Sequence, residues 1–252
     1  MADRHQLLAT LDELLQPDRF RDYGPNGLQV EGALEVRHVV TGVTASLALI
    51  EAAVQARADT VLVHHGLFWR GQDGRVTGWM RQRLALLLAH NINLLAYHLP
   101  LDAHPQWGNN AQLGKVLGLV SDARFGEQDL GFLGARADGG VFDDAQALGA
   151  LISGTLARPV TVVQAEPKRL RRIAWCTGGA QSYFEAAIQA GADVFITGEI
   201  SEPQAHYARE CGVAFVACGH HASERYGVGA LGGHVAAQLS LAHTFIDIDN
   251  PA

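Results

Sequence analysis

The sequence has little of what marks several large protein classes. Its three cysteines form no CxxC pair and are odd in number, so they suggest no disulfide framework. No apolar run is long enough to span a bilayer, and the first residues lack the basic and apolar regions of a signal peptide. No GxSxG, P-loop or GxGxxG motif occurs. We therefore expect a cytoplasmic protein that uses none of these nucleophile or phosphate-binding motifs.

Basic residues are also in deficit, with 19 Lys and Arg against 26 Asp and Glu and a net charge of −7. This balance argues against a free-standing binder of phosphate backbones. The one basic run considered, residues 168–172, leads into the apolar residues from Ile173 and is interpreted as a solvated entry to a strand. Because 48% of the residues are hydrophobic, a substantial core is expected and disorder is not.

Histidines, in contrast, follow two apolar runs that have the composition of buried strands. The run at 61–63 is followed by His64, His65 and Gly66, and the run at 214–218 leads to His220. Neutral imidazole is a preferred ligand of divalent transition metals, so the sequence predicts a metal site. Since neighbouring strand residues point to opposite faces, His64 and His65 reach one site only if the strand has ended. Two adjacent histidines more naturally address two ions, which indicates a dinuclear centre.

Carboxylates stand four residues after a histidine in both halves of the chain. His220 and Glu224 share one face of a helix if a helix begins there. A carboxylate can bridge two ions through its two oxygens, so Glu224 is the candidate bridge, with an electrostatic helix cap as its alternative role. His98 and Asp102 have the same spacing in the first half, where Asp102 could instead be an N-cap.

An internal repeat connects these two halves. Residues 51–59 match residues 185–193 at a constant offset of 134. Each copy is flanked by apolar runs. In both halves a further apolar run follows, at 94–97 and at 215–218, and it leads to polar residues. This is the pattern of parallel βαβ units, whose sites gather at the carboxyl ends of the strands. The alternative is two copies of a common unit with no shared site.

The pattern predicts an α/β fold with two pseudo-symmetric α/β domains and a dinuclear metal site in the cleft between them. The first domain, 1–125, carries His64, His65 and Asp102. The second, 126–252, carries His220 and Glu224, and its C-terminal segment is free to pack back on the first domain. Periodicity predicts helices over 5–16, 45–57, 79–90, 111–118 and 143–156, and strands over 28–32, 36–43, 130–137, 160–164 and 244–248. The loop at 68–78 is either a flap over the site or an ordinary surface loop.

Three further residues are candidates for supporting roles. Glu199 ends the strand that corresponds to the one carrying His65, so it is expected near the pooled site. His98 is either a general base or a group that holds a ligand in place. These two are the candidate catalytic residues. His206 is a weaker candidate, and no substrate-binding residue is identified.

Taken together, these segments resemble a known family. The chain is similar to the NIF-three-like proteins, also called GTP cyclohydrolase I type 2 homologues, over nearly its whole length. The motifs that carry the resemblance occur in the family's order at residues 26–32, 63–66, 98–102, 197–199 with His206, and 219–224.

The resemblance implies two α/β domains, a dinuclear metal centre between them and a homohexameric ring. Carried over by position, one ion would be held by His64, Asp102 and Glu224. The other would be held by His65, His220 and Glu224. Many relatives carry Thr where this chain has Leu99, which removes any hydroxyl contact there. Residues 126–170 leave no room for the inserted domain that some relatives contain.

The function expected from these features is a metal-dependent hydrolase-like enzyme acting on a small molecule, a nucleotide or related heterocycle. Two divalent ions, of Zn, Fe, Mn, Ni or Co, would activate a water for attack. In the reaction of the family's name, that water opens the imidazole ring of GTP and releases formate, while His98 or Glu199 moves protons. The alternative is a non-catalytic, ring-forming adaptor or metal-storage protein. A third reading, nucleic-acid processing inside a ring, would depend on Arg169, Arg171 and Arg172.

Overall fold

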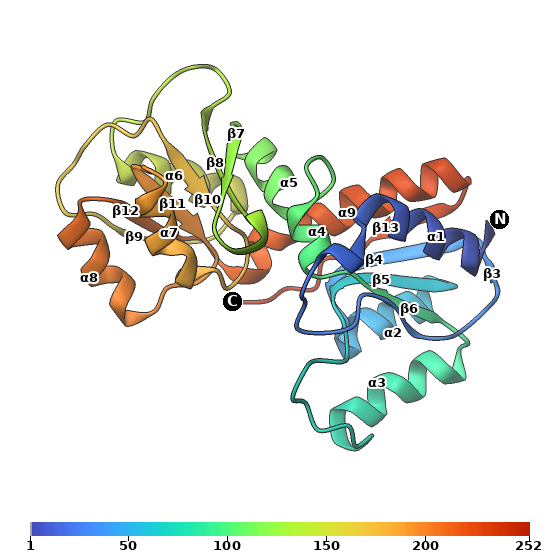
Figure 1. The fold of residues 1–252 in the computed structure, drawn as a ribbon. Helices are drawn as coiled ribbons and strands as arrows, with labels where there is room; N and C mark the ends of the chain where they lie inside the picture. Colours follow the sequence, from blue (N-terminus) through green and yellow to red (C-terminus); the bar gives the residue numbers. More distant parts are fainter. Residues whose placement is uncertain (1) are drawn as a thin grey trace. The chain divides into compact units, whose positions relative to one another are not determined.

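The structure is a computed structural model that describes residues 2–252 and divides the chain into two compact units (Figure 1). Unit 1 contains the chain up to Gly108 and Gly227–Asp249. Unit 2 contains Asn109–Tyr226 and Asn250–Ala252. The fold is α/β, as predicted. The division lies at 108/109, whereas the sequence places it at 125/126, because the helix that follows Gly108 contributes Leu113 to the core of unit 2.

Unit 1 is built on a five-stranded sheet with strand order β13-β4-β5-β6-β2. The first four strands of that order are parallel, and β2 runs antiparallel at the edge. A two-stranded ladder pairs β1 with β3. The elements are β1 (Ala2–Asp3), α1 (Arg4–Leu15), η1 (Pro17–Arg19), β2 (Gly27–Val30), β3 (Glu35–Val36), β4 (His38–Thr44), α2 (Leu47–Gln55), β5 (Thr60–His65), α3 (Gly78–Ala89), β6 (Asn93–Ala96), α4 (Leu99–Ala103) and β13 (Ala242–Phe245).

Apolar clusters cover both faces of this sheet. On β5, Val61 and Val63 belong to the cluster that includes residues of α2 and α3. Leu62 belongs to the opposite cluster, with residues of α1 and of the last helix, α9 (His220–Leu239). This alternation is the period of two expected of a strand. A strand buried on both faces carries apolar side chains until it leaves the core. His64 and His65 lie at that point, at the end of β5.

Unit 2 contains a six-stranded sheet with strand order β7-β8-β10-β11-β12-β9. Its centre, β10-β11-β12, is parallel, and β8 and β9 flank it in antiparallel orientation. The elements are α5 (Asn109–Val116), β7 (Leu119–Phe125), η2 (Glu127–Asp129), β8 (Gly131–Arg136), α6 (Ala145–Leu156), β9 (Thr161–Val163), β10 (Ile173–Trp175), η3 (Gln181–Tyr183), α7 (Phe184–Gln189), β11 (Val194–Thr197), α8 (Glu202–Cys211) and β12 (Ala214–Ala217). Residues 220–226 of α9 also belong to it.

The repeat read from the sequence has a counterpart in hydrogen bonds. Asp59 Oδ2 accepts from the backbone N–H groups of Arg37 and His38, at 2.8 and 3.0 Å. Asp193 Oδ2, 134 residues later, accepts from those of Arg171 and Arg172, at 2.8 and 2.9 Å. In each unit the carboxylate lies just after a helix and bonds to the backbone at the start of the strand that precedes that helix. The pairs are α2 with β4 in unit 1 and α7 with β10 in unit 2.

Most of the predicted elements are present within one or two residues of their predicted bounds. The last strand differs, since β13 covers Ala242–Phe245 rather than 244–248. Strand β7 was not predicted, because its burial alternates irregularly around a bulge between Ser121 and Ala123. Across the described residues, no helix combines the length and apolar character that crossing a membrane requires.

Candidate metal centre

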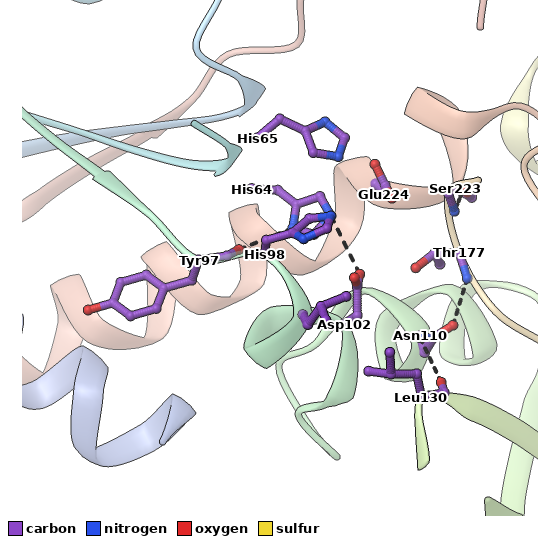
Figure 2. A network of polar contacts seen from close by, with 12 residues as sticks. His64, His65, Tyr97, His98, Asp102, Asn110, Leu130, Thr177, Ser223 and Glu224 are labelled. Carbon is purple, nitrogen blue, oxygen red and sulfur yellow. Dashed lines mark hydrogen bonds and ion pairs between the residues drawn. The ribbon is translucent and has the colours of Figure 1, made fainter. Parts of the chain in front are cut away.

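Three imidazoles come together in unit 1. His64 and His65 are the last residues of β5, and His98 directly precedes α4. One ring nitrogen from each lies within 4.8 Å of the others. The ring centroids are 4.4 Å apart for His64 and His65, 4.9 Å for His64 and His98, and 5.6 Å for His65 and His98. Figure 2 shows these rings together beyond the ends of β5 and β6.

The adjacent histidines meet without leaving the strand. The sequence predicts that the strand ends before His64 and His65, but β5 includes both residues, so this prediction was wrong. Alternation along β5 starts His64 on the face of Leu62 and His65 on the face of Val63. Because they are the last two residues, both side chains reach over the end of the strand, where no further backbone separates the two faces.

The outer nitrogen of each ring is held by an oxygen. His64 Nδ1 donates to the Tyr97 carbonyl at 3.1 Å (Figure 2), and His98 Nδ1 donates to Asp22 Oδ1 at 2.7 Å. His65 Nδ1 lies 3.2 Å from Thr44 Oγ1. A carbonyl or carboxylate accepts a proton and cannot supply one, so in the neutral rings of His64 and His98 the lone pair is on Nε2. Metal-binding histidines are oriented in the same way.

Asp102 adds a carboxylate to this cluster. It lies in the first turn of α4 and is buried, with Oδ1 3.5 Å from His64 Nε2 (Figure 2). The N-cap position of α4 belongs to His98, so the alternative role considered for Asp102 was wrong. Unit 1 therefore offers imidazole and carboxylate donors together.

Asp22 is the site residue that the sequence did not single out. Its Oδ1 accepts from the Tyr23 N–H at 2.6 Å as well as from His98. Its Oδ2 accepts from Asn26 Nδ2 and the Leu99 N–H, both at 2.9 Å. Burial raises the pKa of Asp22, but its hydrogen bond and charge interaction with His98 and the other donors outweigh this and bring it below the usual value. Asp22 thus presents a negative carboxylate to the His98 ring.

Unit 2 contains a donor group of its own at the start of α9. His220 Nε2 lies 3.3 Å from Glu224 Oε2, one helical turn away, so the predicted shared face is confirmed. Glu199 contacts the other ring nitrogen, with Oε1 2.6 Å from Nδ1. Burial lowers the pKa of His220, but hydrogen bonds and charge interactions with Glu224 and Glu199 dominate and raise it to about 9.

The turn after β10 encloses the Glu224 carboxylate. Gly178 has φ +72°, and a Cβ there would collide with Glu224 Oε1. Two hydrogen bonds hold the turn. Asn110 Oδ1 accepts from the Thr177 N–H at 2.8 Å (Figure 2), and Ser223 Oγ accepts from the Gly178 N–H at 3.0 Å. Glu224 itself is only 2% exposed.

His206 lies elsewhere. It stands on the exposed side of α8, where Nε2 contacts Glu202 Oε1 at 2.9 Å. This i, i+4 surface pair accounts for its position. The remaining donors, imidazole and carboxylate, are the types that Zn, Fe, Mn, Ni and Co accept, so the residues present fit a transition metal.

Comparison with known proteins identifies the family. A family model described as Duf34/NIF3 (NGG1p interacting factor 3) matches residues 2–251. The chain belongs to the Duf34/NIF3 family. A relative named GTP cyclohydrolase 1 type 2 homolog, from Neisseria meningitidis serogroup A, is 49% identical over all of both chains. Another of that name, from Pseudomonas aeruginosa, is 48% identical over 98% of this chain and 97% of its own.

Solved structures agree with this membership of Duf34/NIF3. A structure titled protein ybgI, unknown function, superposes with a TM-score of 0.95 at 44% identity and covers both chains completely. TTHA1606 from Thermus thermophilus gives a TM-score of 0.90 at 31% identity, again over both whole chains. The two-unit α/β architecture is therefore that of the Duf34/NIF3 fold.

Proposed function

We propose that this chain is a dinuclear, divalent-metal-dependent hydrolase-like protein that acts on a nucleotide or related heterocycle. One observation carries the proposal. His64 and His65 each have Nδ1 beside an oxygen, so Nε2 is the ring nitrogen that each can offer to an ion, and the His98 ring lies next to both. The relatives named GTP cyclohydrolase 1 type 2 homolog suggest the substrate class.

The ligand assignment follows the family resemblance. We assign His64, Asp102 and Glu224 to one ion, and His65, His220 and Glu224 to the other. Each unit supplies part of this set, and the separate contacts of His64 with Asp102 and of His220 with Glu224 support the assignment. Zn, Fe, Mn, Ni and Co all suit these donors.

When bound, such ions lower the pKa of a water molecule and polarise the bond to be broken. The protein's own residues then orient and move protons. Asp22 fixes the His98 ring so that Nε2 can accept a proton from water. Glu199 contacts His220 through Oε1, so of the two candidate catalytic residues it is better placed to orient a ligand.

Metal content per chain, measured by elemental analysis, tests the centre. We expect about two ions in the wild type and one or none in Glu224→Ala, because the bridge is lost. Glu202→Ala is the control, since it removes an exposed carboxylate of the same type from unit 2. Glu224→Gln keeps the side-chain volume and separates loss of metal from loss of folding. Two ions retained in both Glu224 variants would refute the bridge.

Turnover is tested next with protein loaded with its native metal. Release of formate from GTP, or hydrolysis of another nucleotide, should fall at least 100-fold in His98→Gln, given the ~10²–10⁴-fold contribution typical of a general base. A fully loaded protein that leaves a panel of nucleotides and heterocycles unchanged would favour the non-catalytic, metal-storing alternative.

A further inference from the structure

The segment from Trp69 to Arg83 differs in charge from the rest of the chain. It contains four arginines, Arg70, Arg75, Arg81 and Arg83, against one acidic residue, Asp73, in a protein whose net charge is −7. It also contains two of the four tryptophans. The segment is the loop between β5 and α3 together with the first half of α3 (Figure 1). We call it the Trp–Arg strip.

Much of the strip's positive charge is not neutralised by carboxylates. Arg75 pairs with Asp73 at 2.6 Å. Arg70 donates to the backbone carbonyl of Asp22 at 2.8 Å, a bond that leaves its charge uncompensated. Within residues 2–252, Arg81 and Arg83 form no ion pair with a carboxylate, and Arg83 Nε is buried without a hydrogen-bond acceptor.

An exposed aromatic ring lies among these cations. Trp79 is 51% exposed, although a side chain of this size is usually largely buried. The Arg83 guanidinium lies 4.7 Å from the centroid of the Trp79 ring. At the other end of the strip, Trp69 contacts the metal-site histidines, with ring centroids 5.0 Å from His98 and 6.0 Å from His65.

The basic run noticed in the sequence, residues 168–172, lacks this combination. Arg172 makes two hydrogen bonds to Asp122, at 2.7 and 2.9 Å, and Lys168 lies 3.4 Å from Asp193. The nearby Trp175 is 1% exposed and offers no stacking face. That run therefore has part of its charge compensated and no exposed tryptophan.

We propose that the Trp–Arg strip binds single-stranded nucleic acid, with Trp79 stacking on a base and Arg70, Arg81 and Arg83 contacting phosphates. Exposed aromatic faces combined with unpaired cations bind single strands with little sequence preference. A duplex keeps its bases stacked on each other and cannot use the Trp79 face. The contact between Trp69 and the histidines places one end of the strip beside the candidate metal centre. The binding itself does not depend on the metal chemistry proposed above.

Fluorescence anisotropy with a labelled 20-nucleotide oligo(dT) tests the proposal on the full chain, both metal-loaded and chelator-treated. Trp79→Ala should weaken binding about tenfold, as expected for one lost base stack, and Trp79→Phe should restore most of it. The double variant Arg81→Glu/Arg83→Glu should weaken binding more than tenfold. Arg83 is half-buried, and reversing its charge could prevent folding. Arg81→Glu alone, at an exposed position, then serves in its place and should show part of the same loss of affinity.

The matched control is Arg169→Glu/Arg171→Glu, which reverses two arginines of the other basic run and should leave affinity within twofold. With three phosphate contacts, log K should fall with log salt at a slope of about −2. Metal content should stay at the wild-type level in every strip variant. A failure of the nucleic-acid proposal can therefore be told apart from a failure of the proposed metal centre. No binding at 50 mM salt would overturn the proposal. So would equal losses in the control, or equal affinity for a duplex of the same length.

Discussion

Asp22 is the residue through which the N-terminal part of the chain acts on the imidazole cluster. Four donors converge on its two oxygens, and one of them is the His98 ring. Its lowered pKa means that the carboxylate stays charged at neutral pH. A charged acceptor on Nδ1 fixes the ring's tautomer and makes Nε2 a stronger proton acceptor.

Replacing Asp22 by Ala should therefore lower turnover about 10–100-fold at unchanged metal content, the usual effect on activity of losing such a hydrogen-bond partner. Formate release from GTP, measured on protein loaded with its native metal, gives this change. Asp18→Ala is the control, because it removes a nearby exposed carboxylate that does not contact His98. Unchanged turnover in Asp22→Ala would mean that the Asp22 hydrogen bond does not orient His98 or that His98 does not move protons.

The sequence was sufficient to find the histidines but not Asp22. His64, His65 and His220 stand at the ends of apolar runs, and strand ends can be recognised from local composition. Asp22 lies in a stretch whose only local signal is turn chemistry, from Tyr23 to Gly27. Its partner His98 is 76 residues away, and a contact across that separation leaves no trace in a single sequence.

Among the elements, the turn between β10 and η3 passes close to the Glu224 carboxylate. A Cβ at position 178 would collide with Glu224 Oε1, so the Glu224 carboxylate would have to move. The positive φ of Gly178 adds a second reason for glycine at this position, because L side chains rarely adopt it. Gly178 therefore contributes to the environment of Glu224 together with the hydrogen bonds from Asn110 and Ser223 that hold the turn.

Gly178→Ala should lower the free energy of unfolding by at least ~1–3 kcal/mol, the cost of a non-glycine residue in the left-handed region. It should also reduce metal content by displacing Glu224. The same substitution at Gly154, in helix α6 with open space around it, should instead stabilise by ~0.5–1 kcal/mol. Urea denaturation of both variants gives the comparison, and equal effects would show that the Glu224 contact is unimportant.

Helices and central strands were predictable because each has a clear apolar period. Helix α1 buries Leu7, Leu11 and Leu15 at helical spacing, and β5 is apolar on both faces. Edge elements were harder. Strand β7 is an edge strand that pairs only with β8 and carries a bulge, so its burial does not alternate regularly. The loop at 68–78 gave no periodic signal, and its role depends on contacts of Trp69 that composition does not reveal.

For the molecule as a whole, the charge state of His220 makes stability depend on pH when no metal is bound. Its pKa is about 9 in the folded protein against an ordinary value of 6.5. A group whose pKa is raised by folding stabilises fully below its unfolded pKa, and this contribution disappears as pH rises through its folded pKa. The loss therefore falls between about pH 6.5 and 9.

Chelator-treated wild type should thus have a urea midpoint that drops between pH 6.5 and 9. His220→Gln should be less stable at pH 6.5 and show a flatter profile, because it has no proton to lose. Glu202→Ala should follow the wild type, since its carboxylate does not contact His220. Parallel profiles for His220→Gln and the wild type would contradict the raised pKa.

The position of β13 has a consequence for folding during translation. This strand lies beside β4 in parallel register, with Phe245 paired to Thr41, although about 200 residues of chain separate them. Unit 1 also takes Val228, Leu231 and Val235 into its core. The unit that is synthesised first therefore cannot complete its sheet until nearly the entire chain has emerged. Until β13 has been synthesised, the edge of β4 that pairs with it has no partner strand, and such an edge can pair with other chains.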